Sequence, residues 1–140
     1  MASVLKVDEL QGIVSAGDIT VTSEGGSATQ SLQQGLAKAW ASIDQDSTGH
    51  PVYDSFNVTS TADNSTGETT VTYTNNMNND NYSLSGVGQS ENENGAYFAI
   101  IGKDSSFPNT TSTFRSDIRS SAGSSQDTKY FSFSLHGDLA

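Results

Sequence analysis

The sequence predicts a mainly β protein, in which an antiparallel β-sandwich or jelly-roll-like domain is preceded by short N-terminal strands and one helix. Three observations lead to this fold class. Apolar and polar residues alternate in six or seven short runs, Asn, Asp and Gly mark turns between the runs, and only one segment has helical periodicity. Such regularly spaced short runs are typical of antiparallel sandwiches.

The composition indicates a folded chain with a thin core. Only 33% of the 140 residues are hydrophobic, whereas Ser, Thr and Asn together supply 48 residues. The aromatic residues fall within the alternating runs, which distinguishes the chain from a disordered acidic segment. A small core in a short chain favours subunits that share a core.

The charge of the chain argues against several classes of partner. A net charge of −10 with only six Lys and Arg residues provides no basic stripe for nucleic-acid phosphates or for an anionic membrane. No apolar run approaches the roughly 20 residues that span a bilayer, and the first residues lack the hydrophobic core of a secretion signal. Cysteine is absent, so thiol catalysis, disulfides and Cys-based zinc sites are excluded. We therefore expect no nucleic-acid partner and no membrane insertion.

Residues 1–28 are expected to form an N-terminal attachment segment. Val4–Val7 and Asp18–Thr22 are predicted strands, and a glycine-rich turn follows them. Two such short strands are not stable by themselves and must pair with another sheet or subunit. The expected attachment contacts are Val4, Leu5, Val7, Ile19 and Val21.

Residues 29–44 form the one predicted helix. Its apolar residues recur on a single helical face, namely Leu32, Leu36, Ala39, Trp40 and Ile43. At about 15 residues such a helix is marginal alone and needs a packing partner. We expect it to bundle with its copies about a symmetry axis, which makes these residues the trimer interface. The alternative is that it covers one face of the β-domain.

Residues 45–140 are predicted to form the β-sandwich domain, which begins with a polar turn. Ala96–Ile101 is the best candidate for a central strand, because its apolar run is continuous. Along the alternating runs, every second side chain is expected to be buried. The predicted core comprises Phe56, Val58, Val71, Tyr73, Tyr82, Leu84, Phe98, Ile100, Phe131, Phe133 and Leu135.

No pattern in the sequence predicts catalysis, and we expect neither an enzyme nor a cofactor. The residues Asp44, Asp46 and Thr48 have the spacing of a calcium loop, but Ser55 stands where an EF-hand needs glutamate. A polar turn is therefore preferred over a weak calcium site. The two histidines, at 50 and 136, are far apart in sequence and do not predict a metal pair. There is no G-x-S-x-G nucleophile motif.

Three polar loops are the candidates for recognition. Asn75–Asn81, Ser90–Gly95 and Lys103–Thr113 are rich in Asn, Asp, Tyr and Phe. Hydrogen-bonding groups beside aromatic rings suit a carbohydrate or a polar protein surface, and the alternative is that the loops are solvent-facing connections. Glu91 and Glu93 are interpreted as solvated carboxylates rather than a hydrolytic pair.

Several segments resemble fibre and appendage proteins of tailed bacteriophages, of the marine and cyanobacterial phage type. Ser3–Asp8 is similar to their S-x-L-K-V-[DN] start. The run GLAKAWASI over 35–43, followed by DSFNV over 54–58, is similar to their G-x-A-K-A-W-x-x-[FI] joint and first strand. Thr69–Met77 and Gly137-Asp138 resemble their Y-T-V-N-F-T-x-x-M strand and terminal F-G-D.

The resemblance implies a homotrimeric structural protein of a virion, assembled in the host cytoplasm. A tail fibre or receptor-binding appendage for host attachment is preferred, and a capsid decoration or head-fibre protein is the alternative. A carbohydrate-binding β-sandwich module is a second alternative from a different class. The expected partners are copies of the chain, other virion proteins and a host-surface glycan or protein. Asp44–His50 and residues 102–126 depart from the motifs of the family.

Overall fold

A computed structural model describes residues 5–13, 19–23, 25–89, 97–100 and 107–140, with only the backbone described over 97–100. The chain divides into two compact units, residues 1–36 and residues 37–140. The predicted fold class, mainly β and antiparallel, is confirmed by ten strands and one helix among the described residues. That helix has four residues, and no helix in the described ranges is long enough to cross a membrane.

Among its described residues, the N-terminal unit contains one hairpin. Strand β1 (Thr20–Thr22) pairs antiparallel with β2 (Thr29–Ser31), so a strand forms where the Asp18–Thr22 run predicts it. The strand predicted over Val4–Val7 is not formed, because residues 5–7 belong to no sheet and a strand needs a neighbour to satisfy its backbone groups.

The helix predicted over 29–44 is wrong. The structure has β2 at its start, then α1 (Leu32–Gly35), and then strand β3 (Ala39–Ile43). Alanine or isoleucine at 39, 41 and 43 alternates with Trp40 and Ser42, so this segment also fits the two-residue period of a strand. Strands on both sides of β3 satisfy its backbone groups, and this pairing overrides helical propensity.

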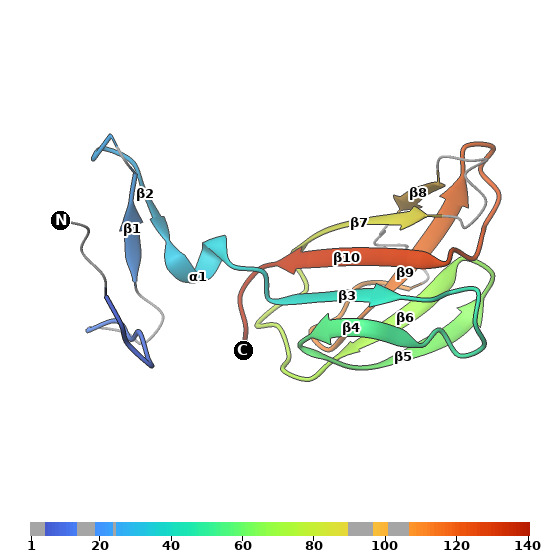
Figure 1. The fold of residues 1–140 in the computed structure, drawn as a ribbon, viewed down its shortest axis with the longest axis horizontal. Helices are drawn as coiled ribbons and strands as arrows, with labels where there is room; N and C mark the ends of the chain where they lie inside the picture. Colours follow the sequence, from blue (N-terminus) through green and yellow to red (C-terminus); the bar gives the residue numbers. More distant parts are fainter. Residues whose placement is uncertain (1–4, 14–18, 24, 90–96, 101–106) are drawn as a thin grey trace. The chain divides into compact units, whose positions relative to one another are not determined.

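The β-domain contains eight antiparallel strands in one hydrogen-bonded sheet (Figure 1). After β3 they are β4 (Val52–Phe56), β5 (Val58–Ser65), β6 (Glu68–Tyr73), β7 (Ser83–Gln89), β8 (Tyr97–Ile100), β9 (Thr113–Ser120) and β10 (Tyr130–His136). Their spatial order is β4-β3-β10-β7-β8-β9-β6-β5. The consecutive strands β7, β8 and β9 with β10 returning beside β7 form a Greek key, which is common in β-sandwiches.

The sheet folds over so that its two halves share a core. The rings of Phe114 on β9 and Phe133 on β10 are 4.7 Å apart, although two strands separate β9 from β10 in the sheet. In Figure 1, β3 and β10 cross in front of β6 and β9. The two halves therefore contribute side chains to one core, and β8 links them by hydrogen bonds.

Most of the predicted core residues lie in or against this core. Val71, Tyr73, Phe131, Phe133 and Leu135 are buried, and Val58, Tyr82 and Leu84 pack against them. The side chains of Phe98 and Ile100 lie outside the described residues, but β8 has the predicted interior place in the strand order. The prediction omitted Ala39, Ala41, Ile43, Met77, Phe114 and Ile118, which are also buried.

Phe56 is the exception among the predicted core residues. Its side chain is 51% exposed, because it lies on β4 directly opposite the outward-facing Trp40 of β3. The prediction of a strand here is confirmed, but the predicted burial of Phe56 is wrong, and the exposed side chains do not alternate regularly along β4.

Asn57 forms the corner that turns the chain from β4 into β5. Its φ of 58° lies in the left-handed region, which asparagine tolerates better than most residues. The side-chain amide donates to the carbonyl oxygens of Lys38 at 2.9 Å and Asn75 at 3.1 Å. Its Oδ1 accepts from the backbone N–H of Asn75 at 2.7 Å. One side chain thus ties the segment before β3 to the segment after β6.

Candidate functional site: the outer face of four strands

One face of the β-domain carries exposed aromatic side chains between serines. We call the outward-pointing residues of the neighbouring strands β4, β3, β10 and β7 the outer face. The strand registers place one row across it, made of Phe56, Trp40, Ser134 and Ser85. The next row is Asp54, Ser42, Ser132 and Val87.

The aromatic side chains of the outer face form two groups. Trp40, 38% exposed, and Phe56 are cross-strand partners in the first row. Tyr53 and Tyr130 form the second group, with ring centroids 5.7 Å apart, and both are exposed. Tyr130 lies four residues along β10 from Ser134, so the two groups are about 13 Å apart along the strands.

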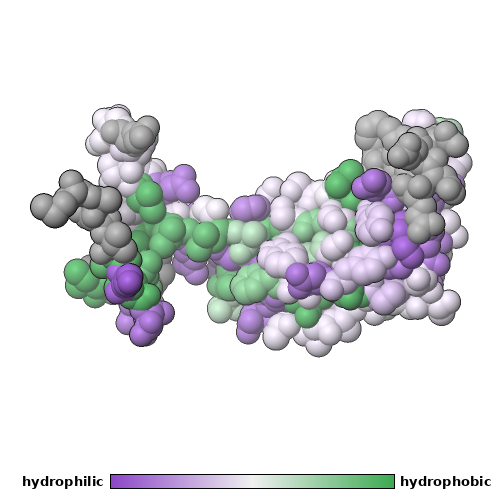
Figure 2. Space-filling view, in the orientation of Figure 1, coloured by the Kyte–Doolittle hydropathy of each residue, from purple (hydrophilic) through white to green (hydrophobic). Residues whose placement is uncertain are grey.

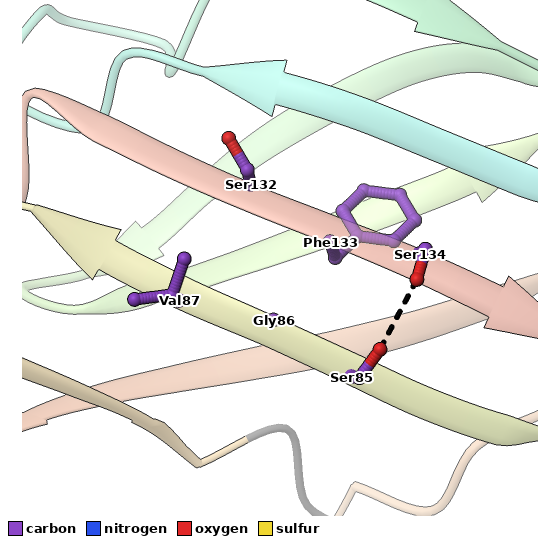
Figure 3. A pocket seen from close by; sticks show the side chains of 6 residues that line it. All are labelled: Ser85, Gly86, Val87, Ser132, Phe133 and Ser134. Atoms are coloured by element: carbon purple, nitrogen blue, oxygen red, sulfur yellow. Dashed lines mark hydrogen bonds between the residues drawn. The ribbon is translucent and has the colours of Figure 1, made fainter.

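Serine hydroxyls fill the space between the aromatic groups. Ser85 and Ser134 are hydrogen-bonded at 3.1 Å across β7 and β10, and Ser132 donates to Ser42 at 3.4 Å. A shallow depression of about 430 Å³ lies over β7 and β10 (Figure 3). Its lining residues are Ser85, Gly86, Val87, Ser132, Phe133 and Ser134.

The outer face is nearly free of charge, although the chain as a whole is acidic. All residues of β3, β4, β7 and β10 are described, and these strands contain neither Lys nor Arg and only one carboxylate, Asp54. Figure 2 shows mostly white and green residues over β3 and β10, with isolated hydrophilic ones. The net charge of −10 is therefore carried almost entirely elsewhere.

The Asp44 carboxylate lies at the Tyr53 end of the outer face and is fully occupied by the chain itself. Its Oδ2 accepts from Lys129 Nζ at 2.8 Å, Tyr53 Oη at 2.8 Å and Ser47 Oγ at 3.0 Å. Burial alone would raise the pKa of Asp44, but the hydrogen bonds from Lys129, Tyr53 and Ser47 outweigh it and lower this pKa to about 2. A calcium ion would have to displace Lys129 to use Asp44.

The segment over 44–50 is a polar turn, as predicted. Asp46 and Thr48 are exposed in it, and His50 donates its backbone N–H to the Ser47 carbonyl at 3.0 Å. Across the described part of the chain, no group of three or more His, Asp or Glu side chains is arranged to hold a metal ion.

His50 is buried and belongs to a polar network inside the domain. Gln45 Nε2 donates to Thr69 Oγ1 at 2.8 Å, and the same hydroxyl is hydrogen-bonded to Nδ1 of His50 at 2.7 Å. The other ring nitrogen of His50, Nε2, faces carboxylate oxygens of Asp63 at 3.5 Å and Asp127 at 4.0 Å. Thr128 completes the network by donating to Gln45 at 2.9 Å.

This network contains the groups of a carboxylate–histidine–hydroxyl relay, but its hydroxyl is not accessible from solvent. Thr69 is fully buried, so no substrate reaches its hydroxyl. His136 ends β10, whereas Thr128 of the His50 network precedes the start of that strand. The structure therefore places the two histidines at opposite ends of β10, not together.

The structure describes the first of the three loops predicted for recognition and part of the third. In Asn75–Asn81, Met77 is buried and bridges to Leu139, and Asn78 donates its N–H to the Asp138 carbonyl at 2.8 Å, so this loop anchors the C-terminal segment. Ser90–Gly95, with Glu91 and Glu93, lies outside the described residues.

The described part of the third loop, residues 107–113, borders a smaller cleft of about 220 Å³. There the Arg115 guanidinium lies 3.9 Å from the centroid of the exposed Phe107 ring. Glu68 forms an ion pair with Arg115 beside this ring. Arg115 is thus engaged by its own chain, and the cleft is less accessible to a partner than the outer face.

Two of the predicted interface residues are buried, whereas the other described interface and attachment residues are exposed or half-buried. Ala39 and Ile43 lie in the chain's own core, so they are not interface residues, whereas Leu36 and Trp40 are exposed and Leu32 is half-buried. Among the attachment residues, Leu5, Val7 and Val21 are exposed and Ile19 is half-buried. Val4 lies outside the described residues.

Sequence reasoning missed the outer face as a site. Helical periodicity places Trp40 in a helix, alternation places Phe56 in the core, and neither pattern distinguishes Tyr53 or Tyr130. The signal for this face is a set of exposed aromatic residues on one side of several strands, and it can be recognised only when the strand order is known.

Comparisons with protein-family models, curated proteins and solved structures gave no match.

Proposed function

We propose that the chain is a structural, non-catalytic subunit of a tailed-phage virion. In this proposal it forms a homotrimeric appendage of the tail-fibre or receptor-binding type, held by its N-terminal segment, with the β-domain exposed. The resemblance of several segments to phage appendage proteins supports this proposal. The observation that carries the attachment role is the unburied apolar surface of the N-terminal unit.

The N-terminal unit contains apolar side chains that it does not bury. Leu5 is 78% exposed, and Val7, Leu10, Ile13 and Val21 are exposed as well. The β1–β2 hairpin has three residue pairs, and a two-stranded hairpin of this size is marginal in water. Such a hairpin gains stability by adding to the sheet of another protein, which satisfies its free edge and covers its apolar residues.

Asp44 and His50, the residues that a metal site or acid–base catalysis would use, form hydrogen bonds within the β-domain. Asp44 accepts hydrogen bonds from three side chains, and His50 lies in a closed network with Thr69 and Gln45. These contacts support a structural role for both residues. A capsid decoration or head-fibre protein needs the same two parts, and electron microscopy of labelled particles distinguishes these locations.

Particle incorporation tests the attachment role. A phage lacking this gene is complemented with the full chain, with a form lacking residues 1–22, and with a Leu5→Ser, Val7→Ser and Val21→Ser variant. We expect both altered forms to be absent from purified particles while the β-domain keeps its circular dichroism spectrum. The matched control is Val87→Ser, an exposed apolar residue of the β-domain, which is expected to incorporate normally.

Normal incorporation of the truncated chain would place the docking surface on the β-domain and contradict the proposal. The trimer is tested separately by analytical ultracentrifugation of the full chain. A monomer at micromolar concentration would contradict a stable homotrimer.

A further inference from the structure

We propose that the outer face of β4, β3, β10 and β7 is a binding site for a neutral polysaccharide. The inference rests on the proposed function only for the biological origin of the glycan, since the binding itself is a property of the β-domain. The proposed binding residues lie on the strands and not in the loops that the sequence predicts for recognition.

The chemistry of the face matches that of a sugar chain. A pyranose ring presents apolar C–H groups on its faces and hydroxyls around its edge. Exposed aromatic rings such as Trp40 and Tyr130 provide flat apolar surfaces for the C–H groups. The hydroxyls of Ser85 and Ser134 bond to each other across the strands, and each oxygen has further acceptor capacity for a sugar hydroxyl.

The composition of the face favours a glycan over a second protein. Protein interfaces are enriched in aromatic residues but depleted in serine, whereas here serines occupy the positions between the aromatic groups. Lys and Arg are absent from all four strands, and Asp54 is the one carboxylate. The cation at the Tyr53 end of the face, Lys129, is paired with Asp44, so this near-neutral surface suits an uncharged partner better than an anionic one.

The dimensions favour an extended chain over a single sugar. The depression over β7 and β10 is open and shallow, and its volume of about 430 Å³ lies beside, not under, the aromatic groups. The Trp40 group and the Tyr130 group are about 13 Å apart along the strands. A ligand that contacts both groups must cross the row of Asp54, Ser42, Ser132 and Val87 between them, and a chain of several sugar units does so.

Trp40 is the only tryptophan, so its fluorescence reports directly on this face. The full chain is titrated with soluble hydroxyethyl cellulose, dextran and galactomannan, and with heparin and polygalacturonate as anionic probes. We expect at least one neutral polymer to change Trp40 emission saturably and to retard the protein in affinity gels, and the anionic polymers to do neither.

Two variants keep the fluorophore and remove aromatic surface from each group. Phe56→Ser and Tyr130→Ser are each expected to weaken binding about tenfold or more, the loss of roughly one good aromatic contact. Phe107→Ser is the matched control, because Phe107 is equally exposed but lies beside β9 on the other half of the sheet, and it should bind as the unaltered chain does.

Any of these binding results would overturn the proposal: no response to any neutral polymer, tighter binding of the anionic ones, unchanged binding by both variants, or equal weakening by Phe107→Ser. Dissociation of an oligomer by Phe56→Ser in ultracentrifugation would show that the face contacts a second copy and would equally overturn it. Because binding is measured on the isolated protein, these results are independent of whether the chain incorporates into particles.

Discussion

Replacing Phe133 by alanine tests the two-layer packing, because this side chain joins the two halves of the sheet. Phe133 is 4% exposed and lies on β10, in the half formed by β4, β3, β10 and β7. Its ring meets Phe114 of β9 edge-on at 4.7 Å and lies 6.0 Å from the ring of Phe131. Truncation removes both contacts and leaves a void between the layers.

The expected cost follows from these contacts. Burial of a phenylalanine side chain is worth about 1.5–3 kcal/mol, and each aromatic pair adds about 0.5–1.5 kcal/mol. With the void that remains, Phe133→Ala should lower the free energy of unfolding by about 3–5 kcal/mol. For a domain of this size, this corresponds to a melting temperature lower by about 12 °C or more.

Urea unfolding followed by far-ultraviolet circular dichroism measures this cost, and Phe56→Ala is the matched control. Phe56 is the same residue type in the same half of the sheet, but it is half exposed and lies opposite Trp40 on the solvent-facing side. Its truncation should cost about 0.2–1 kcal/mol. A cost below about 1 kcal/mol for Phe133→Ala, or an equal cost for the two variants, would refute the assigned direction of the side chains on these strands.

Two further predictions concern single polar side chains. Hydrogen bonds lower the folded-state pKa of Asp44 to about 2 from 3.8, so its stabilising effect is complete above about pH 4 and is lost as the pH falls through 2. Asp44→Asn should therefore lower the free energy of unfolding at pH 6 and lower it much less near pH 2. A loss of stability that does not depend on pH would contradict this prediction. Asn57→Gly removes three hydrogen bonds and should cost about 1–3 kcal/mol, and Asn57→Ala should cost about 1 kcal/mol more because of the positive φ. Equal thermal stability of the Gly and Ala variants would show that the corner relaxes.

Strict alternation of apolar and polar residues predicts a strand with little ambiguity when the segment fits no helical period. Tyr130–His136 alternates aromatic or aliphatic residues with serine, and it forms β10 with Phe131, Phe133 and Leu135 buried. The segment over 29–44 satisfied two periods at once, and only pairing with β4 and β10 decided that Ala39–Ile43 is a strand. Hydrogen bonds to strands distant in sequence outweigh a local preference of this kind.

The sequence by itself determined the mainly β class, the polar turn over 44–50 and the acidic, cysteine-free surface, because these depend on local period and composition. The tertiary structure alone decided that Phe56 faces solvent while Phe133 faces the core, since alternation distinguishes two sides of a strand but not which side is covered. It also brought Trp40, Phe56 and Tyr130 to one face, although 90 positions separate the first from the last. The order of strands in a sheet, which creates such a face, is set by contacts between distant segments.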